Sequence, residues 1–577
     1  MSDEEYKLLI QTAQVVNPLL NLDFGQNGEN AKEAFEGADI SFGGEFKTKN
    51  ATMIVEINGE KKSFKKVTFS IGGNSARTYG RQAFNVKIRG NDELYGRSQF
   101  RIRSDAREPT LLRSKLACDM HNRLGLTSIS ANYISLYIND NYMGIYVIMD
   151  SPKISWAKLE YNDGDTTNLY KCKEALCSLT VESSATGCVN ENDEITENPE
   201  WIEFLTTLDN AQSAEDIEDI FDIDQFLYEI AYEYLSGSWD HFLFNGHNFN
   251  VYKKKGGKWT IIYYDFDADL GQDASFVAIF PHSIVSTDFP SYPFSEWSTL
   301  HQHLIEILIF KDPTRFENIL KNFVREAFNP TILFPRIDEL KELIKPYIIE
   351  EKTPDENGNL PGVINKYGMD YSIEQWDANS EFTTVTDNAM SKGYGIKYWI
   401  LMRYRYVCKA YDIECDPVYM DENYQYTTNK NVEASFDVAP SGPWGDMGNG
   451  NPQQQPIPPT EPSAEPTSEP TQEAEQTPTT NQSPYQCWSE VVGYSCCSSN
   501  ETTVYAHDDN GDWGYDFNKQ EWCGLTPYDE PTQDEACWSE ELGYSCCKSC
   551  KVYETDNDGQ WGYENNQWCG IQSYCSK

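Results

Sequence analysis

The stretch that decides the fold is WDHFLFNGHNFNVY at residues 239–252, which continues through KKKGGK into WTIIYYDFDADLG at residues 259–271. Apolar runs on both sides of a Gly-Gly pair at 256–257 are typical of a β-hairpin with a two-residue turn. Pairing that counts outward from the two glycines places Asn248 opposite Asp265. Directly opposed residues share one face of a hairpin, with Cβ atoms about 5 Å apart.

Three polar side chains of this segment form a candidate catalytic site. The amide oxygen of Asn248 and the carboxylate of Asp265 could hold one Mg²⁺ and leave its other positions to phosphate and water. Phosphoryl transfer depends mainly on such positioning and charge neutralisation. Asp240 precedes Asn248 by eight residues, at the end of a predicted helix, and could accept the proton of an attacking hydroxyl. The alternative is a polar hairpin whose Asn and Asp residues only cap turns.

The sequence around this segment predicts an α+β fold. Alternating apolar residues predict a turn at Asn58-Gly59 and strands at residues 52–57, 66–71, 84–88, 133–138 and 144–149. A helix is expected between the third and fourth of these strands, with Pro109 at its first position and Gly125 at its end. Residues 223–235 have the wide apolar face of a second helix. Strands with one helix, followed mainly by helices, are the order of a two-lobed protein kinase, although many α+β proteins share it.

The composition excludes several classes of partner. The 577 residues include 46 basic and 91 acidic side chains, a net charge of −45, so nucleic acid and anionic membranes are not expected to bind. A nucleotide is still compatible, because bound metal and a few basic groups can reverse the potential inside one cleft. No run of about 18 apolar residues is present to predict a membrane span.

The length and the shifts in composition predict several domains. Residues 426–486 include a long stretch rich in Pro, Thr, Glu, Ser and Gln that cannot bury a core, and they are predicted to be a disordered linker. The other predicted parts are an N-terminal segment (1–38), the mixed α+β domain (39–425), and two small β modules (487–525 and 537–575) joined by a short linker (526–536).

The two small modules are copies of one unit. CWSEVVGYSCC from residue 487 recurs as CWSEELGYSCC from residue 537, and WGY and WCG follow in both copies. Each copy is near the size at which a core alone fails and disulfides become necessary. The cysteines expected to form them, with the connectivity left open, are Cys487, Cys496, Cys497, Cys523, Cys537, Cys546, Cys547, Cys550, Cys569 and Cys575.

Other metal sites are weaker interpretations. Zinc binding by the module cysteines is disfavoured, because adjacent Cys-Cys is poor tetrahedral spacing. A calcium loop at residues 508–512 is disfavoured because its glycine comes too early, and hairpin turns explain the Asn-Gly and Asp-Gly steps better. His241 and His247 are expected to make structural hydrogen bonds rather than to bind metal.

Four motifs of the mixed domain resemble the CotH family of spore-coat proteins. They are FRIRSD…TLLRSKLA (100–117), YIN…YMGIYV (137–147), HNFNVY (247–252) and YDFD (264–267). The resemblance covers roughly residues 40–425. It implies an atypical kinase with a protein-kinase-like fold that uses ATP with Mg²⁺ or Mn²⁺ and phosphorylates secreted or spore-coat proteins on Ser.

The resemblance also implies roles for individual residues. By position it assigns the catalytic base to Asp240 and metal binding to Asn248 and Asp265, with Asp267 assisting. It assigns contact with the phosphates to Lys87. The residues that it implies for the loop over the nucleotide are Gly72, Gly73, Asn74, Ser75 and Arg77.

Four features depart from the family pattern. Tyr264 stands where the family usually has Trp, and Asp150 stands where it commonly has Glu. No glutamate is evident to pair with Lys87, for which Asp119 is one candidate. Asn245 has the spacing from the base that ordinary kinases use for their metal-binding Asn, so it competes with Asn248. A pseudokinase, or transfer of another group such as AMP, therefore stays open.

The repeated modules resemble the fungal dockerin, which is also classed with the family-10 carbohydrate-binding modules. In that family the module docks an enzyme onto the multi-enzyme complexes of anaerobic fungi. Trp522 and Trp568 each precede a cysteine and are expected in the small core. The exposed aromatic residues that the resemblance implies for binding are Tyr494, Trp513, Tyr544 and Trp561.

Taken together, the sequence predicts a secreted CotH-like kinase that transfers the γ-phosphate of ATP to Ser or Thr of extracellular proteins. Its dockerins are expected to bind the scaffold protein of a cellulosome-type complex, and polysaccharide is a further candidate ligand. The start, MSDEEY, lacks a secretory signal, so the N-terminus is expected to be trimmed or incomplete. The alternatives are a dockerin-bearing carbohydrate-active hydrolase that uses paired acids such as Asp265 and Asp267, and a non-catalytic scaffold component.

Overall fold

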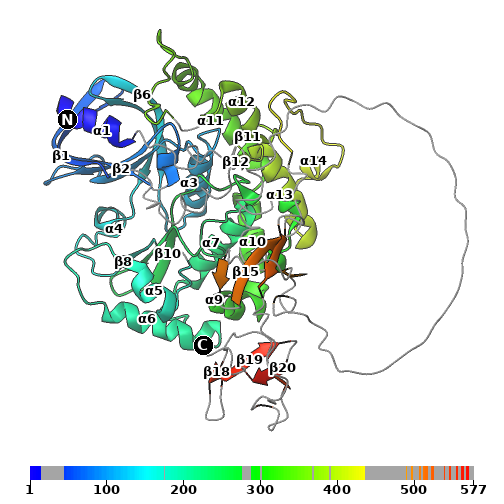
Figure 1. Cartoon of the computed structure of the whole chain (residues 1–577). Helices are drawn as coiled ribbons and strands as arrows, with labels where there is room; N and C mark the ends of the chain where they lie inside the picture. Colours follow the sequence, from blue (N-terminus) through cyan, green and yellow to red (C-terminus); the bar gives the residue numbers. More distant parts are fainter. Residues whose placement is uncertain are drawn as a thin grey trace, which may run out of the picture. The chain divides into compact units, whose positions relative to one another are not determined.

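The computed structural model describes most of the chain up to residue 435 and short stretches after it (Figure 1). The described residues are 1–13, 45–73, 75–173, 176–275, 288–298, 302–366, 370–388, 391–435, 489, 495–497, 506–508, 511–516, 521–525, 539, 545–546, 554–555, 560–564 and 567–570. The chain divides into two compact units, Met1–Gln454 and Gln455–Lys577. Most of the predicted linker, residues 436–486, lies outside the described part. Within the described part, no helix is both long and apolar enough to cross a membrane.

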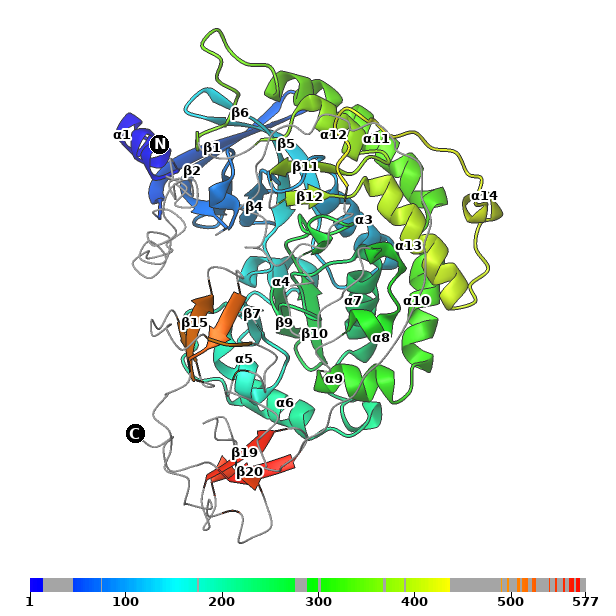
Figure 2. The same cartoon turned by 45° about the vertical axis from the view of Figure 1, so that its right-hand side comes forward.

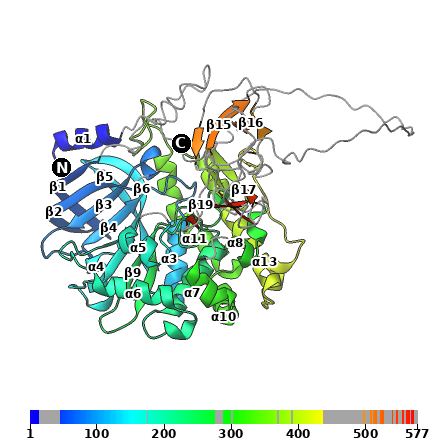
Figure 3. The same ribbon diagram turned by 60° about the horizontal axis from the view of Figure 1, so that its bottom comes forward.

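The first unit begins with a six-stranded antiparallel sheet, along which α1 (Asp3–Ala13) lies (Figure 3). The strands have the order β1-β2-β3-β4-β6-β5. Their bounds are β1 Lys47–Ile57, β2 Glu60–Gly72, β3 Ala83–Ile88, β4 Gln99–Arg103, β5 Ala131–Ile138 and β6 Asn141–Asp150. One face carries an apolar core that includes Phe69, Phe84, Tyr146 and, from α1, Leu9. All five predicted strands are confirmed, as is the two-residue turn at Asn58-Gly59, whose φ angles are 54° and 83°.

The helix between β4 and β5 starts later than predicted. Helix α3 spans Arg113–Leu124, so the expectation that Pro109 occupies its first position is wrong. The Glu108 carboxylate accepts hydrogen bonds from the Thr110 backbone N–H (2.8 Å) and hydroxyl (2.6 Å), and Leu111 has a φ of 58°, which no helix allows. The predicted end is confirmed, because Gly125 caps the helix with a φ of 69°.

The rest of the first unit is a second sheet surrounded by helices (Figure 2). Its strands have the order β10-β9-β7-β8, with bounds β7 Leu169–Cys172, β8 Cys188–Asn190, β9 Phe249–Lys253 and β10 Trp259–Tyr263. The predicted second helix is α7, which packs on β10 and on α10. The helices are α4 Ile154–Tyr161, α5 Val181–Gly187, α6 Pro199–Asn210, α7 Ile223–Ser236, α8 Phe294–Trp297, α9 His303–Ile305, α10 Thr314–Glu326, α11 Pro330–Glu351, α12 Ile373–Asn379, α13 Ile396–Ala410 and α14 Pro417–Met420.

Short elements complete this unit. They are the 3₁₀ helices η1 Ser75–Thr78, η2 Ala214–Asp216 and η4 Phe289–Ser291, the π-helix η5 Glu306–Phe310, and the strand pair β11 Val385–Asn388 and β12 Ser391–Gly393. Two disulfides lie here as well: Cys172–Cys188 joins β7 to β8, and Cys408–Cys415 joins the last turn of α13 to the segment that follows it. Packing continues beyond α14, since the Tyr426 ring stacks on Phe382 with centroids 4.6 Å apart.

The predicted register of the β9–β10 hairpin is wrong by one residue. Trp259 pairs with Lys253 and Tyr263 pairs with Phe249, so Asn248 lies opposite Tyr264 and not Asp265. The connection is five residues long, because the Gly257 N–H bonds to the Lys254 carbonyl across a turn in which Gly256 has a φ of 68°. A five-residue loop shifts every pair by one position relative to a two-residue turn.

The second unit contains two sheets with the same strand order. In the first, β13-β16-β15-β14, β13 pairs in parallel with β16; the second, β17-β20-β19-β18, repeats this pattern. The bounds are β13 Ser495–Cys496, β14 Ala506–Asp508, β15 Gly511–Asp516, β16 Glu521–Gly524, β17 Ser545–Cys546, β18 Glu554–Thr555, β19 Gln560–Glu564 and β20 Gln567–Gly570. The internal repeat is therefore also a repeat of structure.

The cysteines of the second unit are described in part. Cys497 and Cys523 form a disulfide, and Cys496 is also disulfide-bonded. The side chains of the other seven predicted cysteines, and that of Trp568, lie outside the described part. The expectation that Trp522 lies in the core is wrong, since it is 41% exposed. Successive residues of a strand point to opposite faces, so the inward position of Cys523 turns its neighbour outward.

A buried ion pair joins the six-stranded sheet to α11 and yields a test of this packing. Arg81 and Glu351 are 2% and 1% exposed, 2.7 Å apart, and Glu351 also accepts the Ile145 backbone N–H at 3.0 Å. Removing one member of a buried pair leaves an uncompensated charge. We expect Glu351→Gln to lower the free energy of unfolding by about 3 kcal/mol, measured by urea unfolding of the full chain.

The matched control is the exposed pair between Lys158 and Glu93. Lys158→Met is expected to change the free energy of unfolding by about 0.5 kcal/mol or less. Equal effects of the two substitutions would show that the Arg81–Glu351 pair does not hold α11 to the sheet.

Candidate functional site

The β9–β10 hairpin ends at two residues with left-handed backbone. Asn248 precedes β9 with a φ of 56°, and Asp265 follows Tyr264 with a φ of 73°. The hydrogen bond from Tyr264 N to Asn248 O, 3.1 Å long, is the last between the two arms. Non-glycine residues at positive φ are uncommon, and such strain concentrates at functional sites. Strand alternation therefore does not decide where the side chains of Asn248 and Asp265 point.

The loop between α7 and β9 is anchored by a buried carboxylate. Glu233, near the end of α7, accepts the backbone N–H of Phe242 at 3.1 Å and of Leu243 at 2.7 Å, and the hydroxyl of Tyr263 at 2.8 Å. Gly237 ends the helix with a φ of 66°, which lets the chain reverse toward the site. The start of the loop is thus tied to both the helix and the hairpin.

His241 has the structural role expected for it. Its Nδ1 is hydrogen bonded to the Ser238 hydroxyl, and its Nε2 lies 3.0 Å from the Tyr264 carbonyl oxygen. Burial lowers the pKa of His241 to about 4, so the ring is neutral at pH 7 and Nε2 can donate to the carbonyl. This bond ties the loop to the residue before Asp265. His247 lies closer to the site, with Nδ1 3.7 Å from an Asp240 carboxylate oxygen.

Asp240 is the meeting point of two amide side chains. Asn245 Nδ2 donates to its Oδ1 at 2.5 Å, and Asn248 Nδ2 donates to its Oδ2 at 2.9 Å and to its backbone oxygen at 3.1 Å. The structure therefore brings both competing asparagines to the same carboxylate. An amide that donates through its nitrogen leaves its oxygen available as an acceptor or a metal ligand.

Asp265 and Asp267 share one guanidinium. Nη2 of Arg103 bonds to Asp265 Oδ1 and lies 3.4 Å from Asp267 Oδ2. The Arg103 side chain is 11% exposed, against 21% for Asp265 and 14% for Asp267. Arg103 is the last residue of β4, so this contact links the six-stranded sheet to the residues that follow the hairpin.

The charges of this cluster are unequal. Burial raises the pKa of Asp265, but Arg103 and then Arg101 outweigh it and hold that pKa below its usual value. Burial and the neighbouring Asp265 raise the pKa of Asp267 to about 6. Asp265 is therefore the more strongly anionic of the two, as expected for the principal ligand of a cation.

Two further cations near Asp265 were missed by the sequence prediction. The Arg101 guanidinium lies over the Tyr264 ring, 4.2 Å from its centroid, and Lys171 Nζ lies 5.2 Å from the same ring. Burial, followed by repulsion from Arg101, lowers the pKa of Lys171 to about 7. The alternation of FRIR at residues 100–103 was the available signal, because it places both arginines on one face of a strand.

Lys87 and the predicted glycine loop lie next to this cluster. In β3, Lys87 is exposed and pairs with Thr68 and Gln99, a register that gives it the same sheet face as Arg101 and Arg103. Among the described contacts, none joins Lys87 to Asp240, Asn248, Asp265 or Asp267. Its role stays a prediction.

Of the predicted loop residues, the two glycines are the best described. A Cβ on Gly72 would meet Asn85 Nδ2 at 3.0 Å, and one on Gly73, whose φ is 67°, would lie 3.8 Å from Arg103 Nη1. Asn74 lies outside the described residues. Ser75 begins η1, and the carbonyl of Arg77 in η1 accepts a hydrogen bond from Asn365 at 3.2 Å. The loop thus reaches Arg103 through Gly73.

Asp119 does not pair with Lys87, so that suggestion is wrong. Its carboxylate bonds to Lys115 one turn earlier in α3 and to Arg336 of α11, whose Nη2 lies 2.8 Å away. Position on the helix explains the error, because Asp119 faces α11 rather than the sheet.

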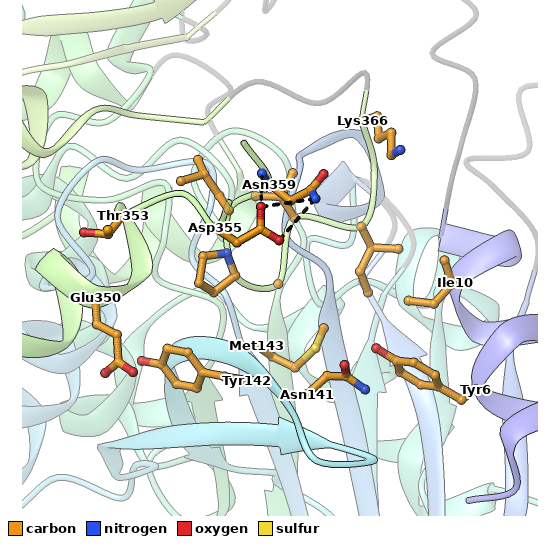
Figure 4. A pocket seen from close by; sticks show the side chains of 15 residues that line it. Tyr6, Ile10, Asn141, Tyr142, Met143, Glu350, Thr353, Asp355, Asn359 and Lys366 are labelled. Carbon is orange, nitrogen blue, oxygen red and sulfur yellow. Dashed lines mark hydrogen bonds between the residues drawn. The ribbon is translucent and has the colours of Figure 1, made fainter. Parts of the chain in front are cut away.

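A separate cavity of about 670 Å³ lies away from the predicted residues (Figure 4). It is bounded by α1, the β5–β6 turn and the segment after α11. Tyr6, Tyr142 and Met143 line one side, and the turn of Asp355 and Asn359 lines the other, where the Asp355 carboxylate accepts the Asn359 backbone N–H at 2.8 Å. The predicted catalytic and metal-binding residues do not line this cavity.

The aromatic residues predicted to bind through the modules are described only in part. Trp513 lies in β15 and pairs with Ala506 and Gly524, and Trp561 holds the equivalent position in β19. The side chains of both, and the whole of Tyr494 and Tyr544, lie outside the described part.

Comparison with known proteins finds a matching family for the first part of the chain and another for its repeated modules. Residues 69–387 match the family described as CotH kinase protein, and residues 486–525 and 536–571 match a cellulose or protein binding domain. Over 373 residues the chain is 24% identical to Invasin CotH3 of Rhizopus delemar, covering 61% of this chain and 60% of that protein. Over 290 residues it is 20% identical to inner spore coat protein H of Bacillus subtilis, covering 48% and 76%. The chain thus spans 60% of the length of Invasin CotH3 and about half, 51%, of the Rhizopus spore coat protein homolog 1.

The modules have relatives in anaerobic fungi. Feruloyl esterase B of Piromyces equi is 58% identical over 51 residues, which is 9% of each chain. Among solved structures, the double dockerin from Piromyces equi Cel45A matches 16% of this chain and 92% of its own at 36% identity, with a TM-score of 0.08. The Helicobacter pylori proinflammatory kinase CtkA matches 42% of this chain and 82% of its own at 14% identity, with a TM-score of 0.20. The family match covers more than half of the chain, so the protein belongs to the CotH family and ends in two fungal dockerin modules.

Proposed function

We propose that this protein is a secreted protein kinase of the CotH type that transfers the γ-phosphate of ATP to Ser or Thr of extracellular proteins. The observation that carries the proposal is the convergence at the hairpin. Asp240 is held by two amides, and Asp265 and Asp267 lie around a buried cation. Phosphoryl transfer needs a base for the hydroxyl and oxygen ligands for a metal, and the loop and hairpin supply both kinds of group.

The order of the strands supports a two-lobed kinase-like arrangement. In protein kinases a glycine-rich loop joins the first two strands, and the phosphate-binding lysine lies on the third, just before a helix. Here the Gly72-Gly73 loop joins β2 and β3, and the strand before α3 is β4. This order makes β4, which carries Arg101 and Arg103, the counterpart of the kinase strand with the phosphate-binding lysine, rather than β3 with Lys87.

The residues present suit a divalent metal. Asp265, Asp267 and Asn248 offer the carboxylate and amide oxygens that Mg²⁺ and Mn²⁺ prefer, and the Arg103 guanidinium stands as a positive charge between the two carboxylates. The metal would neutralise the charge of the phosphates. Asn245 and Asn248 hold the Asp240 carboxylate for the substrate hydroxyl, and Arg101, Arg103 and Lys171 give the adjoining surface its positive charge.

Disulfides and dockerins support secretion into a multi-enzyme complex. Structural disulfides persist in oxidising compartments, and both units contain them. We propose that the two dockerin modules bind the scaffold of a cellulosome-type complex and bring the kinase to proteins assembled there.

Phosphate transfer tests the catalytic assignment. We expect the full chain to transfer label from γ-labelled ATP to itself or to proteins of the complex in the presence of Mn²⁺. Asp240→Asn is expected to lower the rate about 10²–10³-fold because the base is lost. Asp265→Asn is expected to abolish labelling, Arg103→Met to lower it more than Lys87→Met, and Asp119→Asn to leave it unchanged.

Equal labelling by wild type and Asp265→Asn would contradict the kinase assignment. Sugar release from a polysaccharide panel without labelling would favour the hydrolase alternative. The lack of any nucleotide-induced shift in melting temperature would favour a scaffold role. Phosphoserine mapping of the proteins held by the modules would identify the acceptor.

Measuring the affinity for a scaffold protein tests the binding role proposed for the modules. Two linked modules bind with an avidity of about 10²–10⁴ over one, so Trp513→Ala or Trp561→Ala alone should weaken binding strongly and the double variant should abolish it. Calorimetry of the full chain with a purified fungal scaffold measures the affinity. Trp522→Ala is the comparison, because that ring is exposed on the neighbouring strand. Loss of binding in Trp522→Ala alone would show that the binding surface lies around Trp522 instead.

A further inference from the structure

Arg103 occupies the position that the proposed metal would need. A single nitrogen of its guanidinium contacts carboxylates of both Asp265 and Asp267. Arginine stays charged in proteins, so it cannot give up its proton when a second cation arrives. Two cations a few Å apart in a site this buried would repel strongly. Metal binding therefore requires Arg103 to move.

Asp105, two residues further along the chain, is a buried carboxylate without an ion-pair contact among the described residues. It is 2% exposed, and within the described part of the chain neither of its side-chain oxygens accepts a hydrogen bond of ordinary geometry, although the Ser114 hydroxyl lies nearby and partly offsets the rise that burial causes in its pKa. Its backbone has a φ of 42°, which adds local strain. Buried ionisable groups are normally paired, because leaving one unpaired costs much of its lost hydration. The Asp105 carboxylate can thus accept a hydrogen bond from a further donor.

Arg103, Asp105 and Asp267 border one narrow gap that is too small to hold a water molecule. Ala76, Tyr79 and Ala83 form part of its wall. Gly73 lies against Nη1 of Arg103, where a larger residue would restrict that group. Because the guanidinium and the Asp105 and Asp267 carboxylates border the same gap, Arg103 can exchange partners by a local rotation, with small shifts of the residues around it.

We propose that Arg103 alternates between two sets of carboxylates. In the metal-free protein it pairs with Asp265 and Asp267; when a divalent cation binds these acids, it moves to Asp105. Arg103 thus offsets one negative charge of the two acids, and Asp105 accepts the guanidinium when the metal binds. The inference rests on the proposed metal site and assigns a positioning role to Asp105, which the proposed reaction does not use.

Metal affinity measured without nucleotide tests this exchange. In calorimetric titration of the full chain with Mn²⁺, Asp105→Asn is expected to weaken binding about tenfold, because the displaced guanidinium loses its charged partner. Arg103→Met is expected to strengthen binding, because the competing cation is gone. Asp265→Asn identifies the heat that belongs to this site, and Asp119→Asn controls for the loss of one negative charge elsewhere.

The double variant decides whether Asp105 acts through Arg103. With Arg103→Met in place, Asp105→Asn should change the Mn²⁺ affinity by less than about twofold. An equal loss in both backgrounds would mean that Asp105 contacts the metal or acts only by its charge, and would overturn the exchange. An unchanged affinity in the single variant would overturn it as well. If wild-type protein gave no heat that Asp265→Asn removes, the metal site itself, and with it the proposed function, would fail.

Discussion

The contact between Arg103 and the two acids after the hairpin joins two parts of the first unit. β4 brings the arginine from the six-stranded sheet, and the end of β10 brings Asp265 from the second sheet. Burying charges in this way is costly unless every charge is paired. The contact therefore links the two sheets in the metal-free protein and holds both acids close to one cation. Because acidic residues greatly outnumber basic ones in this chain, arginines placed beside buried carboxylates lower the cost of burying those acids.

Other buried arginines follow the same logic around the site. Arg113 at the start of α3 bonds to Glu108 at 2.7 Å and to the backbone oxygen of Asp269 at 3.0 Å, and both arginine and glutamate are fully buried. Arg107 reaches Asp273 at 3.2 Å. These contacts join the segment between β4 and α3 to the chain just beyond Asp267. The acids after the hairpin are thus positioned by cations from a segment that lies far away in the sequence.

The sequence predicted the elements better than it predicted their pairing. Strand alternation, the Asn58-Gly59 turn and the end of α3 at Gly125 depend on local preferences, and all were confirmed. The β9–β10 register was wrong because Gly256 and Gly257 fit both a two-residue turn and a longer loop, and only the pairing beyond them distinguishes the two. Asn248 and Asp265 nonetheless both stand where the hairpin ends, because each leaves the ladder through a left-handed residue. Asn and Asp adopt this conformation more readily than other non-glycine residues, but residue type alone does not say which of them do so here.

The sequence did not predict the basic residues of the site, for a different reason. Family position points to Lys87, whereas the contact of Arg103 with the acids depends on where the sheet places β4. Placing several cations close together disfavours their charged forms. Burial and the nearby Arg101 lower the pKa of Lys171 to about 7. Lys171 is therefore only partly charged at neutral pH while no anion is present. A phosphate chain beside Arg101 and Lys171 would favour the protonated lysine and raise its pKa again. Arg101 and Lys171 would thus offer the proposed nucleotide a local positive surface on a protein whose net charge is −45.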